Sequence, residues 1–163
     1  MPKYILAILL VLMAAPAGAV TNATVPAVQL SLLVNLVPAV VTPVAVTFGV
    51  QNYLNGVTHA VGTSQVVIQR PGTYSVSVGA QTGAVSNLLC WGDLWLRVNG
   101  VDVANSGVRW ARAGSAFTDV LTVRAVLPLA VGDSVQVMMS SLVMGRGCGF
   151  YKVTQAGEPA MPA

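Results

Sequence analysis

Much of the chain consists of short runs in which every second residue is apolar. Over residues 73–78, Tyr74, Val76 and Val78 alternate with threonine and serine, and a second set follows: Leu121, Val123, Ala125 and Leu127. A side-chain period of two is typical of a β-strand that buries one face. Glycine, proline and asparagine separate the runs at short intervals, and no helical period is sustained. The pattern predicts an all-β, antiparallel sandwich or barrel.

The strongest local signal is Asn99-Gly100, which lies between Val98 and Val101. A two-residue hairpin turn of this kind needs positive φ at both central positions, and asparagine and glycine tolerate it. We therefore expect a hairpin with its first strand over residues 94–98 and its return strand over residues 101–104.

Other turns and strands follow from the same chemistry. Turns are expected at Asn55-Gly56 and at Val131-Gly132-Asp133. Short strands are expected over residues 65–69 and 150–154, and Pro128 is expected to end the strand that begins near residue 121. Three prolines interrupt the valine-rich residues 25–50, which favours short, kinked edge strands there.

The first 19 residues have the pattern of an export signal. Lys3 precedes an apolar run over residues 5–13, and Ala17-Gly18-Ala19 is a small-x-small cleavage site. The run is shorter than the roughly 20 residues of a membrane-spanning helix, although an uncleaved anchor is the alternative. We expect a secreted or extracellular protein (in the periplasm or on the cell surface if bacterial) with no stable membrane span after processing.

Charge is scarce in this sequence: 55% of residues are hydrophobic and 8% are charged, against about 25% charged in an ordinary soluble domain. The basic residues are scattered, which argues against a nucleic-acid partner. No long linker divides the chain. We expect a signal peptide over residues 1–19, an N-terminal segment over 20–39, one domain over 40–155 and a flexible tail over 156–163.

Export makes a disulfide between Cys90 and Cys148 the expected state of the two cysteines, with two buried free thiols as the alternative. A metal site is not expected, because two cysteines and His59 are too few ligands at the wrong spacing. No cofactor is expected either, since the sequence has no phosphate-binding loop and no dinucleotide fingerprint.

Catalysis is not expected. His59 is the only histidine, no Gly-x-Ser-x-Gly motif accompanies it, and nothing in the sequence brings an aspartate to it. Glu158 lies in the expected tail and Asp133 in a turn, so neither is assigned to a carboxylate pair.

Four segments, in this order, resemble the C1q and tumour-necrosis-factor superfamily: residues 71–76 (PGTYSV), 96–100 (LRVNG), 129–135 (LAVGDSV) and 149–153 (GFYKV). The resemblance implies a ten-strand jelly-roll sandwich, a homotrimer and no catalysis. The chain departs from the family in three ways. It has no collagen-like stretch, no evident acidic calcium cluster and no Phe-x-Gly-Phe in the last strand.

Five aromatic and basic residues are candidates for a ligand-binding or partner surface: Trp91, Trp95, Arg97, Trp110 and Arg112. Tryptophan and arginine are enriched at binding hot spots. Strand alternation places Trp95 and Arg97 opposite Leu94 and Leu96. The alternative is that Trp95 covers the second sheet or a neighbouring subunit.

Two functions fit these expectations. The first is a secreted, non-enzymatic binding module that acts as a homotrimer and recognises a protein or glycan ligand. The second is a structural jelly-roll subunit of a virion or of a cell-surface assembly. The export signal favours the first, and the low charge favours the second.

Overall fold

The computed structural model describes residues 25–32, 34–38, 41–84, 87–112, 119–142 and 148–151. All regular structure in these ranges is β-strand, which confirms the all-β prediction. The signal 1–19 and the tail 156–163 lie outside the described residues. None of the described ranges forms a helix that could cross a bilayer. The strands are β1 (Ala27–Ser31), β2 (Val44–Ala45), β3 (Val50–Asn55), β4 (Val57–His59), β5 (Val66–Ile68), β6 (Gly72–Gly83), β7 (Cys90–Val98), β8 (Val101–Asp102), β9 (Val108–Arg112), β10 (Asp119–Leu129), β11 (Ser134–Ser141) and β12 (Gly149–Phe150).

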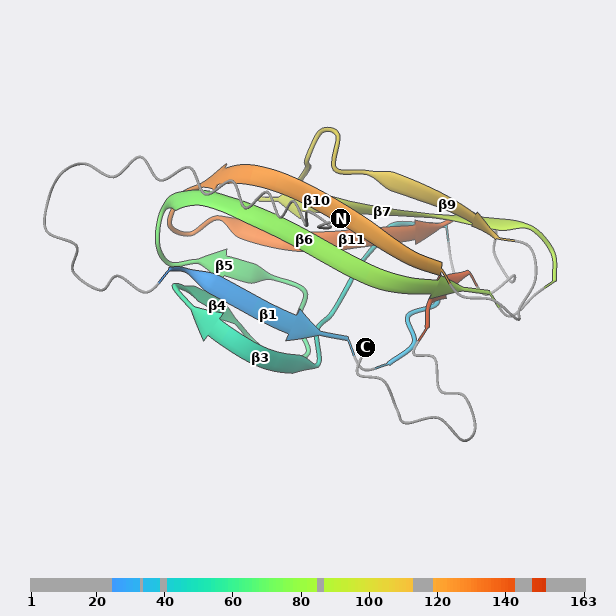
Figure 1. Cartoon of the computed structure of the whole chain (residues 1–163), viewed down its shortest axis with the longest axis horizontal. Coiled ribbons are helices and arrows are strands. Elements are labelled where there is room, and N and C mark those ends of the chain that lie inside the picture. Colours follow the sequence, from blue (N-terminus) through green and yellow to red (C-terminus); the bar gives the residue numbers. More distant parts are fainter. Residues whose placement is uncertain are drawn as a thin grey trace, which may run out of the picture.

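The strands pair antiparallel in three sheets (Figure 1). The largest follows the order β4-β5-β11-β7-β8, with β2 added to β11 and β9 added to β7. A second sheet has the order β10-β6-β12, and β1 pairs with β3 as a separate ribbon. These antiparallel sheets are consistent with a β-sandwich.

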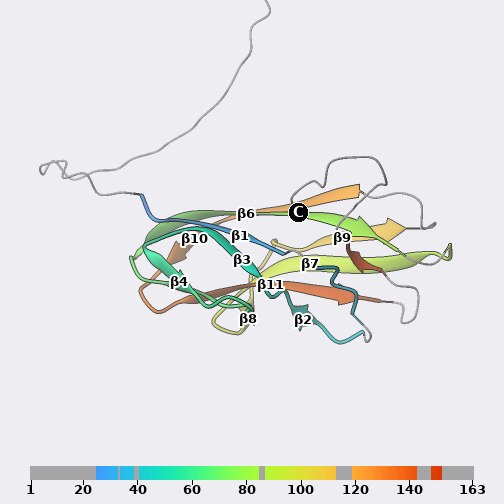
Figure 2. The same ribbon diagram turned by 90° about the horizontal axis from the view of Figure 1, so that it is seen from below.

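The main core lies between the largest sheet and the β10-β6-β12 sheet, which form separate layers in Figure 2. Leu94 and Leu96 of β7 and Met139 of β11 are completely buried, and they share one apolar cluster with Val123 of β10 and Phe150 of β12. Each layer therefore contributes one face to the same core, as expected when two half-buried sheets stack.

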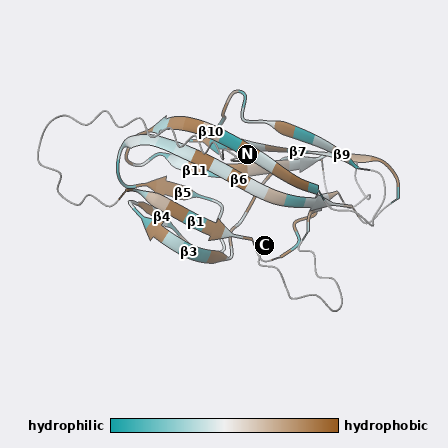
Figure 3. Cartoon of the chain, in the orientation of Figure 1, coloured by the Kyte–Doolittle hydropathy of each residue, from teal (hydrophilic) through white to brown (hydrophobic). Residues whose placement is uncertain are grey.

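Strands β6 and β10 show why the alternating pattern is informative. They pair along their whole lengths, from Gly72↔Leu129 to Thr82↔Asp119. On β10, Val123 and Leu129 are buried while Thr122 is exposed. Figure 3 shows apolar and polar stretches following one another along this strand. The predicted alternation is confirmed.

The prediction that Pro128 ends its strand is wrong. The proline lies inside β10, opposite Thr73. Among the described strands, β10 has a neighbour on one side only, in the order β10-β6-β12. The missing N–H of Pro128 therefore costs no hydrogen bond on the open side.

The predicted hairpin at Asn99-Gly100 is confirmed. Asn99 has φ of 51° and Gly100 has φ of 81°, and β8 returns along β7 with Val101 opposite Val98. The return strand is shorter than expected and stops at Asp102.

Replacing Gly100 with valine is expected to destabilise the protein by about 1 kcal/mol or more, because a β-branched residue resists positive φ. No atom lies within 4 Å of the position where its Cβ would be, so the effect would come from the backbone alone. Urea unfolding is the measurement. Gly100→Asn is the control, and it is expected to lose much less stability than Gly100→Val. Equal stability of Gly100→Val and wild type would contradict the turn assignment.

The second predicted turn, at residues 131–133, is also confirmed and contacts the hairpin. Gly132 has φ of 88°. The Asp133 carboxylate accepts hydrogen bonds from the Asn99 side chain at 2.7 Å and from the Ala130 N–H at 2.7 Å. These two donors, the Asn99 amide first, hold the pKa of Asp133 below its ordinary value. The side chains of two glycine-bearing turns thus fix each other.

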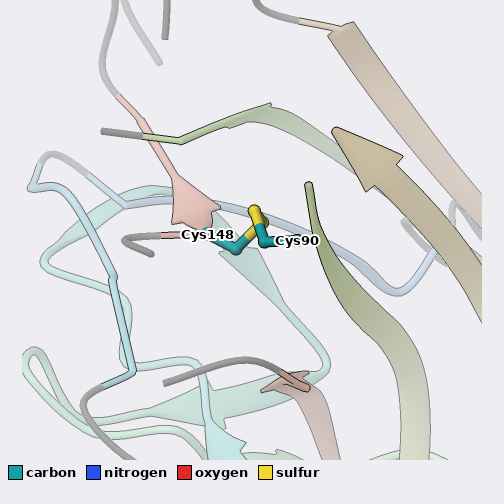
Figure 4. The surroundings of a disulfide bond; sticks show 2 residues. All are labelled: Cys90 and Cys148. Atoms are coloured by element: carbon teal, nitrogen blue, oxygen red, sulfur yellow. A yellow bond between two sulfur atoms is a disulfide. The ribbon is translucent and has the colours of Figure 1, made fainter. Parts of the chain in front are cut away.

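Cys90 and Cys148 form a disulfide, which confirms that pairing over two free thiols (Figure 4). Their Cα atoms are 6.1 Å apart, and both residues are completely buried. Cys90 begins β7 and Cys148 precedes β12, so the bond joins the two main sheets at one end of the core.

The two ends of the described chain agree with the predictions in part. Strands β1 and β2, within the proline-interrupted residues 25–50, are as short as expected. Of the last predicted strand, residues 150–154, the structure shows Phe150 in β12 and Tyr151 just after it. Residues 152–154 lie outside the described part.

Candidate ligand-binding surface on strand β7

The outward face of β7 carries four large or charged side chains in a row. Trp91, Asp93, Trp95 and Arg97 alternate with Cys90, Gly92, Leu94 and Leu96, which are buried. The strand period of two places the first set on the side away from the core. Sequence reasoning therefore placed Trp95 and Arg97 correctly.

Trp95 and Arg97 share a carboxylate across the hairpin. The Trp95 indole Nε1–H donates to Asp102 Oδ1 at 2.8 Å, and the Arg97 Nε–H donates to the same oxygen at 2.7 Å. Strand register places Asp102 directly opposite Arg97. The Asp102 carboxylate therefore fixes the edge of the Trp95 ring and keeps the charge of Arg97 beside it.

A second ion pair lies on the same face, across the β7–β9 pairing. Arg109 Nε donates to Asp93 Oδ1 at 2.7 Å and Arg109 Nη2 to Oδ2 at 3.1 Å, so the contact is bidentate. Bidentate guanidinium–carboxylate pairs are geometrically well defined. Asp93 and Arg109 are thus held as a fixed set of polar groups next to Trp95.

These groups surround a shallow surface pocket of about 540 Å³. Its walls combine an aromatic ring, paired charges and small apolar residues, contributed by Asp93, Trp95, Asp102, Val103, Gly107, Val108 and Arg109. A concave site with a few oriented polar groups is the usual form of a small-ligand subsite.

Trp110 does not belong to this surface, and its inclusion in the predicted set was wrong. It lies opposite Gly92 in the β7–β9 pairing and is 8% exposed. Its ring stacks on Phe150 of the other sheet at a centroid distance of 5.8 Å. Because Gly92 faces the core, its cross-strand partner does too.

Arg112 is also on the inner face, so its assignment to an exposed surface was wrong. It lies opposite Cys90, is 7% exposed and forms an ion pair with Asp119. Pairing with Asp119 compensates the charge of a buried guanidinium. The five predicted residues therefore divide into an outward group (Trp91, Trp95 and Arg97) and an inward group (Trp110 and Arg112).

Three charged pocket residues were missed by the sequence prediction: Asp93, Asp102 and Arg109. A signal for two of them was present. Asp93 has the same strand parity as Trp95, and a two-residue turn at Asn99-Gly100 places residue 102 opposite residue 97. Arg109 could not be placed, because its position depends on how β9 registers against β7.

The pKa of Asp102 lies below its ordinary value because the Arg97 and Trp95 hydrogen bonds favour the ionised carboxylate. A lowered folded-state pKa contributes stability above the unfolded pKa, and this stability is lost as pH falls through the folded pKa. The difference in melting temperature between wild type and Asp102→Asn is therefore expected to be constant above about pH 4 and to shrink below it. A melting-temperature difference that stays constant throughout a pH series of thermal melts would contradict the lowered pKa of Asp102.

His59 lies away from this surface and does not contact an aspartate through any described hydrogen bond. Its Nδ1 lies 3.2 Å from Gln51 Nε2 and its Nε2 lies 3.1 Å from the Thr63 carbonyl oxygen. In the described ranges, no group of three histidine, cysteine or acidic residues could hold a metal ion.

Comparison of the chain with protein-family models and with curated proteins finds no match to either.

Proposed function

We propose that this protein is a secreted, non-enzymatic binding module with a C1q/TNF-like jelly roll, which acts as a homotrimer and recognises a protein or glycan ligand at the Trp95 pocket. The observation that carries the proposal is the outward Trp95 ring, fixed by Asp102 and flanked by a second ion pair. Sequence features that predict export support its location.

The order in which the chain visits the two layers supports a jelly roll. Strand β5 belongs to the largest sheet, β6 to the β10-β6-β12 sheet and β7 to the largest again. The chain then crosses to β10, back to β11 and again to β12. Repeated crossing between two antiparallel sheets is typical of jelly rolls, which combine Greek-key connections.

The outer face of the β6–β10 pair supports assembly into a trimer. Val120 and Val126 are 71% and 69% exposed there, and Arg124 is the one charged residue on this face of the described strands. The other members are small, polar or apolar: Thr73, Ser75, Ser77, Gly79, Gln81, Thr122 and Pro128. Depletion of charge is a feature of subunit interface cores.

The charges around Trp95 favour a neutral glycan over a strongly charged ligand. Two carboxylates, Asp93 and Asp102, are paired with two guanidinium groups, Arg109 and Arg97. The site thus offers hydrogen-bond donors and acceptors without a net charge, which suits a ligand with many hydroxyl groups. The apolar ring of Trp95 offers a face on which a sugar ring can lie.

Replacing Trp95 with alanine is expected to weaken binding at least tenfold, because Trp95 is the one aromatic side chain among the residues that line the pocket. The measurement is binding to a panel of immobilised neutral and acidic glycans, followed by calorimetry on the best neutral binder. Trp91→Ala is the matched control. Trp91 lies on the same strand face but does not line the pocket, so this variant is expected to bind as wild type does.

Two outcomes would contradict the proposal. One is that the protein binds no glycan of the panel and that Trp95→Ala leaves its binding to every purified protein ligand unchanged. The other is equal loss from Trp91→Ala and Trp95→Ala, which would indicate general damage to β7.

A structural subunit of a virion or cell-surface assembly is the second candidate. The observation that favours it is the low charge of the sequence, 8% of residues, because extensive tiling would cover much of the surface.

A further inference from the structure

Two asparagine–glycine pairs occur in the sequence, and both begin the same tripeptide. Asn55-Gly56-Val57 links β3 to β4, and Asn99-Gly100-Val101 links β7 to β8. Both glycines have positive φ, 67° at Gly56 and 81° at Gly100. Because the residues of the two tripeptides are identical, a difference in their chemical reactivity in the folded protein would come from the structure around them.

An asparagine that precedes glycine can lose ammonia in a spontaneous reaction. The glycine backbone nitrogen gives up its proton and attacks the side-chain carbon Cγ, and glycine has no Cβ to hinder this approach. The new N–Cγ bond closes a succinimide ring while the Cγ–Nδ2 bond breaks, and the side-chain nitrogen leaves with that proton as ammonia. Water then opens the ring at either carbonyl, which gives aspartate or isoaspartate. The carboxamide must be free to turn toward the glycine nitrogen.

The Asn99 carboxamide is held at both of its ends. Its Nδ2 donates to Asp133 Oδ1 at 2.7 Å, and its Oδ1 accepts from the Ser134 N–H at 2.8 Å. The Asn99 N–H also donates to the Ser134 carbonyl at 2.9 Å, which fixes the backbone at the same place. Hydrogen bonds to a carboxylate are stronger than those between neutral groups. The carboxamide must therefore break two bonds, one of them strong, to reach the Gly100 nitrogen.

The Asn55 carboxamide is held at one end only in the described structure. Its Nδ2 donates to the Val25 carbonyl at 2.8 Å, and no described group donates to its Oδ1. Val25 is 67% exposed, so water competes for the same carbonyl and little is lost when this neutral bond breaks. Asn55 and Gly56 are partly exposed, which lets water reach the ring that forms there.

We propose that Asn55 is a site of spontaneous deamidation and that the hydrogen bonds of Asn99 protect the second pair from the same reaction. The folded protein is expected to react at least about tenfold faster at Asn55, because one more hydrogen bond, made to a charged group, must break at Asn99. Water is the only co-reactant, so the modification needs neither an enzyme nor a cofactor.

The product at position 55 weakens the ribbon of β1 and β3, which begins at the pair Ala27↔Asn55 (Figure 1). An ionised carboxylate has no hydrogen to donate, so it would place an acceptor against the Val25 carbonyl where a donor now lies. Isoaspartate also adds a methylene group to the backbone next to the positive φ of Gly56. Deamidation therefore loosens the first residues of β1 from β3.

Peptide mapping by mass spectrometry, after incubation of the folded full chain at neutral pH, tests the proposal. Asn55 is expected to deamidate at least about tenfold faster than Asn99. The matched control is the same chain unfolded in urea, in which the two pairs are expected to react at similar rates. Equal rates in the folded chain, faster reaction at Asn99, or the same preference for Asn55 in urea would overturn the proposal.

Two variants test the cause and the consequence. Asp133→Ala removes the acceptor of Asn99 Nδ2, so reaction at Asn99 is expected to accelerate about tenfold while Asn55 in the same sample is unchanged. Asn55→Asp imitates one product, and its β1 amides are expected to exchange hydrogen about fivefold faster than in wild type. An unchanged rate at Asn99 would overturn the protection, and unchanged exchange would overturn the loosening of β1. The wild-type comparison needs no substitution, so it decides even if a variant fails to fold.

Discussion

Replacing Gly92 with alanine is expected to lower the free energy of unfolding by about 3 kcal/mol or more. A Cβ at this position would lie closer than 3.0 Å to three atoms of the Trp110 ring, a separation that real Cβ atoms essentially never show. The ring cannot move aside freely, because it stacks on Phe150. Relief therefore requires either displacement of the largest core side chain or separation of β7 from β9.

Two controls isolate the Trp110 contact as the cause. Gly79→Ala also adds a methyl group within a strand, but no atom lies within 4 Å of the new Cβ, so this variant is expected to keep wild-type stability. In a Trp110→Ala background, Gly92→Ala is expected to cost much less, a non-additivity that a double-mutant cycle measures in urea. Full additivity would show that Trp110 does not lie over Gly92.

Removal of the disulfide is expected to cost about 4 kcal/mol by the chain-entropy relation, because the bond closes a loop with a sequence separation of 58. The appropriate variant is Cys90→Ala/Cys148→Ala. Both sulfurs are buried without exposure, and a serine hydroxyl there would add the separate cost of a buried polar group. Urea unfolding of oxidised wild type and of the double variant gives the difference.

Single replacements control for the loss of packing. Cys90→Ala and Cys148→Ala each break the same bond, so each is expected to lose about as much stability as the double variant. A loss below about 1 kcal/mol in the double variant would contradict a loop-closing role. Non-reducing peptide mapping of wild type is expected to recover the Cys90–Cys148 pair, and fully alkylatable cysteines in the native protein would contradict it.

Local sequence patterns predicted the strands well because strand burial and turn chemistry depend on neighbouring residues. The alternation at residues 73–78 and the turn at Asn99-Gly100 both appear in the structure. Pro128 misled the prediction because its tolerance depends on β10 having an open edge. A proline is compatible both with the end of a strand and with an edge strand, and the order of the whole sheet decides between the two.

The candidate site was predicted in part for the same reason. Trp95 and Arg97 were placed correctly from the parity of one strand. Trp110 and Arg112 were grouped with them by residue type, although the register of β9 against β7 turns both toward the core. Cross-strand register is a property of two segments, and the sequence between Asp102 and Val108 contains no two-residue turn to fix it.

The mass of the folded protein in solution tests the proposed function most directly. Light scattering coupled to size-exclusion chromatography of the processed protein is expected to give one species with the mass of three protomers. In this trimer, neighbouring subunits would cover the outer face of β6 and β10. Replacing Val126 with glutamate, on that exposed face, is expected to yield monomers that still bind a glycan at Trp95. A monomeric wild type, or large shells and sheets in place of a trimer, would contradict the proposal of a discrete trimeric binding module.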